Sequence, residues 1–209
     1  MPSYPPPAPS DPRAREVLIH WFGDLPAVDT LPEGKMGLWF TKQAETDRDL
    51  RERFAGLRRA AIAGTLNDWL DSARGRLAAI LLIDQFSRNL FRETPEAFAQ
   101  DPLAREWCLE GLAQGMEQQL SHMERLFFCL PLEHAEELPR QLQFLDISEQ
   151  FVREVPETLR EWAGKVRTSA QAHHDIVARF GRFPHRNNAL GRESTAEEIA
   201  FLQTPNSSF

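Results

Sequence analysis

The chain has 209 residues, of which 42% are hydrophobic, enough apolar material for the core of one large domain. Its formal net charge of −7 argues against a nucleic-acid partner, because non-specific nucleic-acid binders carry a broad basic surface. The longest apolar run, residues 77–83, is far shorter than the roughly 20 residues of a membrane-spanning helix. We therefore expect a cytoplasmic protein without a membrane partner.

The N-terminal segment, residues 1–10, is rich in proline and lacks the basic start and apolar stretch of a secretory signal. It is predicted to be a flexible tail, and residues 11–209 are predicted to form a single all-helical domain. The domain begins with a helix whose start is indicated by Asp11 and Pro12 and whose end is indicated by Gly23.

Further capping signals divide the rest of the chain into helices. Thr46 with Asp49 resembles a capping box, and Gly64 is typical of the end of the helix that it opens. A helix predicted over residues 76–89 begins apolar on every face, which is typical of a buried central helix. Further helix starts are indicated by Asp101–Pro102, Ser121–Glu124 and Thr195–Glu198, and the helix that begins at Asp101 is predicted to end near Gly115. Pro131 and Pro139 are predicted to break the chain after the second of these starts. Two more helices are predicted at 140–153 and 157–180, separated by Pro156, and the second ends at Gly181.

These signals predict about eight to ten helices in antiparallel pairs and almost no strand, which is an all-α irregular bundle or solenoid. Trp39 and Phe40 could form a dimer face or pack in the core, and the core is the favoured prediction. The oligomeric state stays open. Cys108 and Cys129 lie among apolar neighbours without a CxxC spacing, so we expect buried reduced thiols and no zinc site.

The first polar segment, residues 84–89, closes the apolar helix. Asp84 and Arg88 are four residues apart, on the same stripe as Leu77. They are predicted either to pair with each other or a neighbouring backbone end, or to face a ligand together with Asn89 in a polar pocket. The sequence leaves both alternatives open.

The second polar segment, residues 173–187, follows the apolar stripe of the predicted helix 157–180. His173 lies on that stripe and is interpreted as a core histidine. If the segment has only a structural role, Asp175 and Arg179 are predicted to form an ordinary ion pair four residues apart. Guanidinium groups bind carboxylate or phosphate in a bidentate manner, but they also neutralise helix ends and acidic neighbours. The basic run at this helix end consists of Arg179, Arg182, His185 and Arg186.

The third polar segment contains Glu133 and His134, which diverge by about 100° on a helix and therefore do not bind one metal together. The common Glu-x-x-His, HExxH, GxGxxG and GxSxG templates are absent. A metal phosphohydrolase site using His134, His174 and Asp175 needs a later aspartate, and none follows Asp175. We expect no metal and no cofactor.

The strings LLIDQFSRN, FFCLPLEHAE and HHDIVARFGRFPHRN, followed by LGREST, resemble the signature segments of the bacterial family called domain of unknown function 924. The resemblance covers about residues 14–203. It implies an all-α fold similar to tetratricopeptide-type helical repeats, without an assigned activity. It also implies a polar site made of Asp84, Arg88, Asn89, Glu133, His134, His174, Arg179, Arg182, His185, Arg186 and Asn187.

Three residues depart from the family pattern. Ser87 stands where proline is expected, Cys129 where tyrosine is expected and Ala135 where serine is expected. The resemblance therefore implies no catalytic hydroxyl at positions 129 and 135 of this chain.

Three functions are compatible with these segments. The favoured hypothesis is a binding module whose Arg/His-lined pocket takes an anionic group of a small ligand or of a protein or peptide partner. The second is an enzyme that acts on a small anionic molecule, with His134, His174 or His185 as general acid or base. The third is a buried polar network that only fixes helix register.

Overall fold

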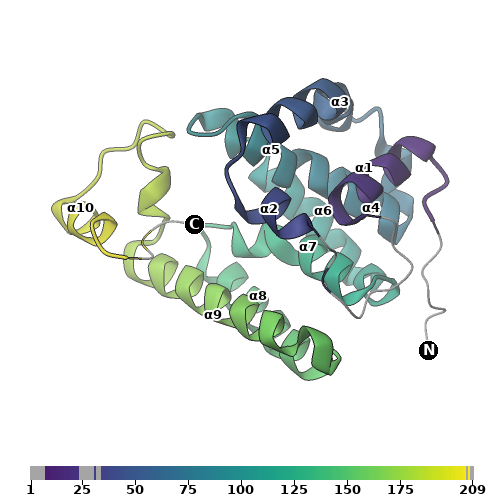
Figure 1. Ribbon diagram of the computed structural model, residues 1–209. Helices are drawn as coiled ribbons and strands as arrows, with labels where there is room; N and C mark the ends of the chain where they lie inside the picture. The colour runs from purple at the N-terminus through teal and green to yellow at the C-terminus, as the bar shows by residue number, and fades with distance from the viewer. Residues whose placement is uncertain (1–7, 24–30, 32–33, 206, 208–209) are drawn as a thin grey trace.

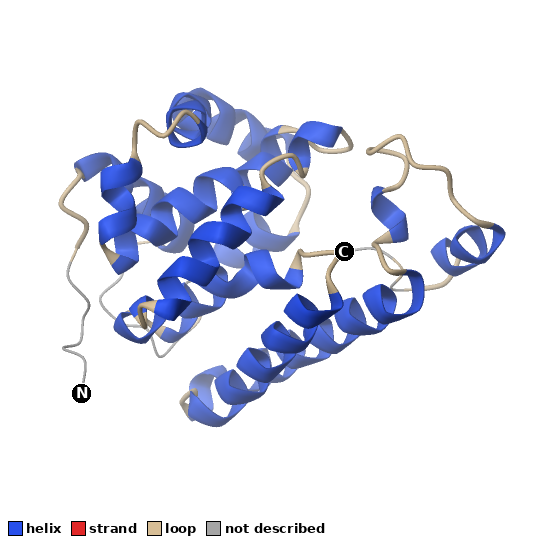
Figure 2. Cartoon of the chain, turned by 180° about the vertical axis from the view of Figure 1, so that it is seen from behind, coloured by secondary structure: helices blue, strands red, loops and turns tan. Residues whose placement is uncertain are grey.

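The computed structural model describes residues 8–23, 31, 34–205 and 207, and this part of the chain contains helices and no strand (Figures 1 and 2). The predicted all-α class is confirmed. None of the described helices combines the length and apolarity of a membrane span. The described helices are α1 (Pro12–Phe22), α2 (Lys35–Phe40), α3 (Ala44–Ile62), α4 (Ala73–Ile83), α5 (Gln85–Leu90), α6 (Asp101–Ala113), α7 (His122–Glu133), α8 (Leu138–Glu154), α9 (Glu157–Phe180) and α10 (Ala196–Leu202), with the short 3₁₀ helices η1 (Asn67–Asp71), η2 (Pro95–Ala97), η3 (Met116–Gln119) and η4 (Pro184–Arg186).

Helix α4 is the centre of the fold. It packs against α1, α3, α6 and α7, and its apolar residues 77–83 are at most 1% exposed. A helix that is apolar on every face is stable in water only when other helices cover it. The prediction of a buried central helix is therefore confirmed.

The helix predicted over 76–89 is in fact two helices, with a break at Asp84. Helix α4 begins at Ala73, because the hydroxyl of Ser72 accepts a hydrogen bond from the backbone N–H of Gly75 at 3.2 Å. Helix α5 begins at Gln85 after the backbone of Asp84 leaves regular helical geometry, with φ −96° and ψ −73°. No glycine or proline marks this position, so the local sequence carries no signal for the break.

The capping predictions had mixed outcomes. Ser121 and Thr195 form the expected capping boxes at the starts of α7 and α10. The capping box at Thr46 is wrong, since α3 already begins at Ala44 and the Thr46 hydroxyl donates to the side chain of Gln43 at 3.4 Å. Asp11 caps α1 as predicted.

The predicted break at Pro131 is also wrong. Helix α7 continues through Pro131 to Glu133, and its last turn is closed by the N–H of His134, which donates to the carbonyl of Leu130 at 3.0 Å. A proline this close to a helix end removes few backbone bonds. Pro139 lies in the first turn of α8, where proline is compatible with a helix.

The aromatic pair Trp39–Phe40 divides between core and surface. Trp39 is buried, as predicted, and its indole N–H donates to the carbonyl of Trp21 at 3.0 Å. The core prediction is wrong for Phe40, which is 60% exposed and contacts Trp162 of α9 with ring centroids 5.4 Å apart. Cys108 and Cys129 are buried free thiols, as predicted. The two thiols also lie beside each other.

Helices α8 and α9 lie side by side as a long antiparallel pair along one side of the molecule (Figure 1). After α9, Gly181 adopts φ +68°, a conformation that favours glycine, and the chain turns back into η4. A small second apolar cluster of Ile176, Val177 and Phe183 fixes this turn. The C-terminal segment thereby returns to the body of the fold. The likeness to tetratricopeptide repeats and the division into tail and domain stay predictions, and residues 1–7 lie outside the described residues.

Helix α6 approaches α7 so closely that Gly111 leaves no room for a side chain. A Cβ at this position would lie 2.4 Å from Cζ of the buried Phe128 and 2.8 Å from Cδ of Arg76. We predict that Gly111→Ala lowers the free energy of unfolding by about 1–3 kcal/mol in urea denaturation. Gly56 of α3 is the matched control: no atom lies within 4 Å of its Cβ position. Gly56→Ala is expected to raise stability by about 0.5–1 kcal/mol, and equal stability of both variants would contradict this packing.

Candidate functional site

A cluster of charged side chains lies where the α4–α5 break, the start of α6, the end of α7 and η4 come together. We call it the acid–arginine cluster, and its members are Asp84, Arg88, Asp101, His134 and Arg186. The five residues come from four separate segments, because Asp84 and Arg88 are only four residues apart. Their hydrogen bonds therefore connect the helical body to the C-terminal segment.

Asp84 is 0% exposed, and its carboxylate accepts several hydrogen bonds. Its Oδ1 lies 2.8 Å from Nδ1 of His134 and 3.0 Å from Nη1 of Arg88, and its Oδ2 accepts from the Gln85 amide at 2.7 Å. Burial raises the pKa of Asp84, but the charge of Arg88 and the contact with His134 outweigh burial, so that the pKa lies well below its usual value. The carboxylate is therefore ionised at neutral pH.

Asp101 is the carboxylate that two arginines share. Arg88 binds it in a bidentate manner, with both Nη–Oδ distances at 3.0 Å, and Nη1 of Arg186 donates to its Oδ2 at 3.1 Å. Such charge-assisted pairs are strong and directional. The prediction that Asp101 caps α6 is wrong, since Gln100 occupies the cap position and the Asp101 side chain is engaged by the arginines.

Arg186 lies between two aromatic rings, 4.7 Å from the centroid of Phe98 and 4.6 Å from that of Phe183. It is 6% exposed. Burial and the charge of Arg88 lower the pKa of Arg186 to about 10, so the guanidinium stays charged at neutral pH. Its Nε is buried and has no hydrogen-bond acceptor within the described residues. A charged buried donor without an acceptor is unusual.

His134 follows the last residue of α7, and its side chain is 14% exposed. Because the acceptor at Nδ1 is an ionised carboxylate, Nδ1 carries a proton and Nε2 is the basic nitrogen of the neutral ring. The described residues offer Nε2 no hydrogen bond. The neighbouring Glu133 points elsewhere and accepts from the Ser169 hydroxyl at 3.0 Å. The expected divergence of Glu133 and His134 is therefore confirmed.

Two further histidines lie against Phe183. Nδ1 of His173 donates to the carbonyl of Ser169 at 2.9 Å, and burial lowers the pKa of His173. Burial and the charge of Arg186 lower the pKa of His185 to about 3. Both imidazoles are therefore neutral at physiological pH, and His173 is the core histidine that its place on the apolar stripe predicted.

The rest of the basic run points away from this cluster, toward α10. Arg182 binds Glu198 with distances of 2.6 and 2.8 Å, and Asn187 donates to the same carboxylate at 3.3 Å. Glu198 is also the capping-box partner of Thr195. These residues form a separate network that holds α10 in place.

The predicted ion pair between Asp175 and Arg179 is wrong. Arg179 reaches Glu197 of α10 at 2.7 Å, and Asp175 contacts His174 at 2.9 Å on the outer side of α9. Helix α10 brings Glu197 close to Arg179, and the spacing of residues within α9 gives no sign of this partner. The last predicted residue, Asn89, lies beside the ion pair of Asp47 and Arg92, away from Arg186.

The structure thus brings together Asp84, Arg88, His134 and Arg186 from the predicted set, with His185 beside them. Sequence reasoning missed the role of Asp101, whose position before Pro102 looked like a helix cap, and it missed Phe98 altogether. No group of three or more potential metal-binding His, Cys, Asp or Glu side chains is found in the described parts of the chain.

The fold and this cluster define an all-α protein with a buried ionic site between its helical body and its C-terminal segment. The chain belongs to the family described as "Bacterial protein of unknown function (DUF924)", whose model matches residues 17–206. It is also similar to a solved protein of unknown function from Agrobacterium tumefaciens, with 41% identity and a TM-score of 0.70 over 79% of this chain and 88% of that one. A search among curated proteins finds no match.

The low pKa of His185 predicts a specific pH dependence of stability. The unfolded histidine titrates near pH 6.5, so between about pH 6.5 and pH 3 the unfolded chain binds more protons than the folded chain, and stability falls as the pH falls. We expect the loss of unfolding free energy between about pH 7 and pH 5 to be smaller by about 1–2 kcal/mol in His185→Gln than in the unsubstituted chain. Urea denaturation at both pH values measures this difference, and equal losses would show that His185 is not a buried neutral imidazole.

Proposed function

We propose that the acid–arginine cluster binds the anionic group, a carboxylate or phosphate, of a small molecule. The observation that carries the proposal is the Nε–H of Arg186, which is buried without an acceptor while Nη1 of the same guanidinium is held by Asp101. An oxygen of a bound anion beside this edge of the guanidinium supplies the missing acceptor.

The charges of the cluster are compatible with this role. Two arginines face two aspartates, so the charges of these four side chains balance formally. The rings of Phe98 and Phe183 exclude water from Arg186, which strengthens such an interaction.

A purely structural network fits less well. In such a network each buried donor has an acceptor, as the Arg182–Glu198 pair illustrates, because an unsatisfied buried group costs about 1–3 kcal/mol. The low exposure of Arg186 also favours a small ligand over an extended protein surface. Peptide binding would require a chain end to enter beside the guanidinium.

The substitution Arg186→Lys tests the anion site, because lysine retains a positive charge near Asp101 but lacks the Nε–H donor. We predict that inorganic phosphate or acetate raises the melting temperature of the unsubstituted chain and that its apparent affinity falls about tenfold in Arg186→Lys. Thermal-shift titrations at constant ionic strength measure both effects, with chloride as the reference anion.

Arg179→Lys is the matched control, since Arg179 forms an exposed ion pair with Glu197 outside the cluster. It is expected to respond to phosphate and acetate as the unsubstituted chain does. The proposal is wrong if neither anion shifts the melting temperature, or if Arg186→Lys keeps the full response. If the Arg186→Lys variant is strongly destabilised and neither anion raises the melting temperature of the unsubstituted chain, the cluster has only a structural role.

A second candidate function, proton transfer to or from the bound molecule, is favoured by the contact between Asp84 and His134. The buried carboxylate fixes the imidazole at Nδ1 and leaves the basic Nε2 unbonded at the edge of the cluster. This is the arrangement in which a carboxylate orients a catalytic histidine. Such a base next to an anion site is suited to hydrolysis of an anionic ester.

We predict that a screen of chromogenic phosphate and carboxylate esters finds a hydrolysis rate that falls at least about 100-fold in His134→Ala, because loss of a general base typically costs that much. The control His122→Gln removes another partly exposed histidine of α7 and is expected to retain the rate. Circular dichroism establishes that both variants are folded. Equal rates in His134→Ala and the unsubstituted chain would exclude His134 as the base.

A further inference from the structure

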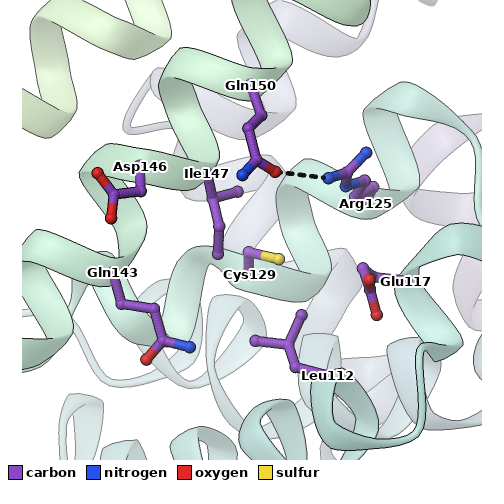
Figure 3. Close-up of a pocket in the computed structure, with 8 residues that line it drawn as sticks. All are labelled: Leu112, Glu117, Arg125, Cys129, Gln143, Asp146, Ile147 and Gln150. Atoms are coloured by element: carbon purple, nitrogen blue, oxygen red, sulfur yellow. Dashed lines mark hydrogen bonds between the residues drawn. The ribbon is translucent and has the colours of Figure 1, made fainter.

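A pocket of about 250 Å³ lies between the α6–η3 region, α7 and α8, and none of its lining residues belongs to the acid–arginine cluster. Figure 3 shows side chains from these elements around the space, with the Cys129 thiol and the side chain of Ile147 near its middle. The volume is several times the roughly 30 Å³ that one water molecule occupies in the liquid, so a small organic molecule fits.

Glu117 is the unusual member of this lining. It belongs to η3 and is 8% exposed, and its Oε2 is buried without a hydrogen-bond partner in the described chain. No described lysine, arginine or histidine forms an ion pair with it. Nearly buried carboxylates are normally paired, because removing the charge from water without compensation is unfavourable. Glu117 thus presents an acceptor without a donor inside a pocket.

The basic residue of the lining does not compensate Glu117. Arg125 is engaged by Glu154 of α8 at 2.5 Å and contacts the amide oxygen of Gln150 at 3.4 Å (Figure 3). The lining also contains a second carboxylate, that of Asp146, whose exposed side chain lies at the rim of the pocket. The pocket therefore carries an excess of negative charge.

We propose that this pocket binds a small organic ammonium compound whose charged nitrogen donates to Glu117. Leu112, Ile147 and Cys129 provide apolar walls for a short aliphatic part of the ligand. A dehydrated metal ion fits this lining poorly, because two carboxylates and amides flanked by leucine and isoleucine do not supply a complete set of oxygen ligands.

Calorimetric titration with butylammonium chloride at neutral pH tests the proposal, with 1-butanol and sodium butyrate as probes of nearly the same size. We expect saturable butylammonium binding with a dissociation constant on the order of 1 mM, because so small a ligand makes few contacts. Butanol and butyrate are expected to bind at least about tenfold more weakly, since neither brings a cation to Glu117.

Three variants locate the binding site. Glu117→Gln is expected to weaken butylammonium binding about tenfold or more, and its melting temperature is expected to equal or exceed that of the unsubstituted chain, because a neutral amide is easier to bury than an unpaired charge. Asp146→Asn, at the exposed rim, is expected to weaken binding by about threefold or less. Glu106→Gln removes an exposed carboxylate of α6 outside the pocket and is expected to leave binding unchanged.

The proposal is overturned if butylammonium binding is not saturable, if butanol binds equally well, or if Glu117→Gln binds as tightly as the unsubstituted chain. Unfolding of Glu117→Gln would overturn it as well, because Glu117 would then stabilise the fold through a partner within the chain. Asp146→Asn supports the site independently, since its exposed side chain makes no contribution to the core.

Discussion

The carboxylate of Asp84 is completely buried and ionised, and much of the structure follows from the partners that it requires. A buried charge is tolerated only when hydrogen bonds and opposite charges replace its hydration. Arg88 comes from the next turn of the same segment and His134 from the end of α7. The carboxylate of Asp84 thus joins the break between α4 and α5 to the end of α7.

A chain of ion pairs connects Asp84 to the C-terminal segment. Arg88 also binds Asp101, and Asp101 accepts from Arg186, which follows it by 85 residues. The second apolar cluster around Phe183 is small, so the ionic contacts contribute much of the specificity with which η4 returns to the body of the fold. A polar network can serve this positioning role even when its net contribution to stability is modest.

The sequence predicted most helices because caps and periodic apolar residues are local signals, as Ser121, Thr195 and the apolar run of α4 show. It failed where long-range contacts decide the outcome. Asp101 looked like a cap because its arginine partners come from other segments, and Arg179 pairs with a carboxylate that α10 brings back. The sequence singled out Asp84, Arg88 and His134, which the structure places in one cluster. The separation of Arg182 and Asn187 into a second network was not predictable, because it depends on the position of Glu198.

Among the arginine, lysine and carboxylate side chains of the described residues, two buried atoms lack a hydrogen-bond partner, and they carry opposite charge. The Nε–H of Arg186 is a hydrogen-bond donor on a cationic side chain and has no acceptor. Oε2 of Glu117 is a hydrogen-bond acceptor on an anionic side chain and has no donor within the described residues. If both belonged to structure alone, each would carry an uncompensated desolvation cost. The two atoms lie in different surroundings, one between aromatic rings and the other beside a pocket of about 250 Å³. The two proposed ligands, which are of opposite charge, would each supply one of the missing partners, and neither proposal depends on the other.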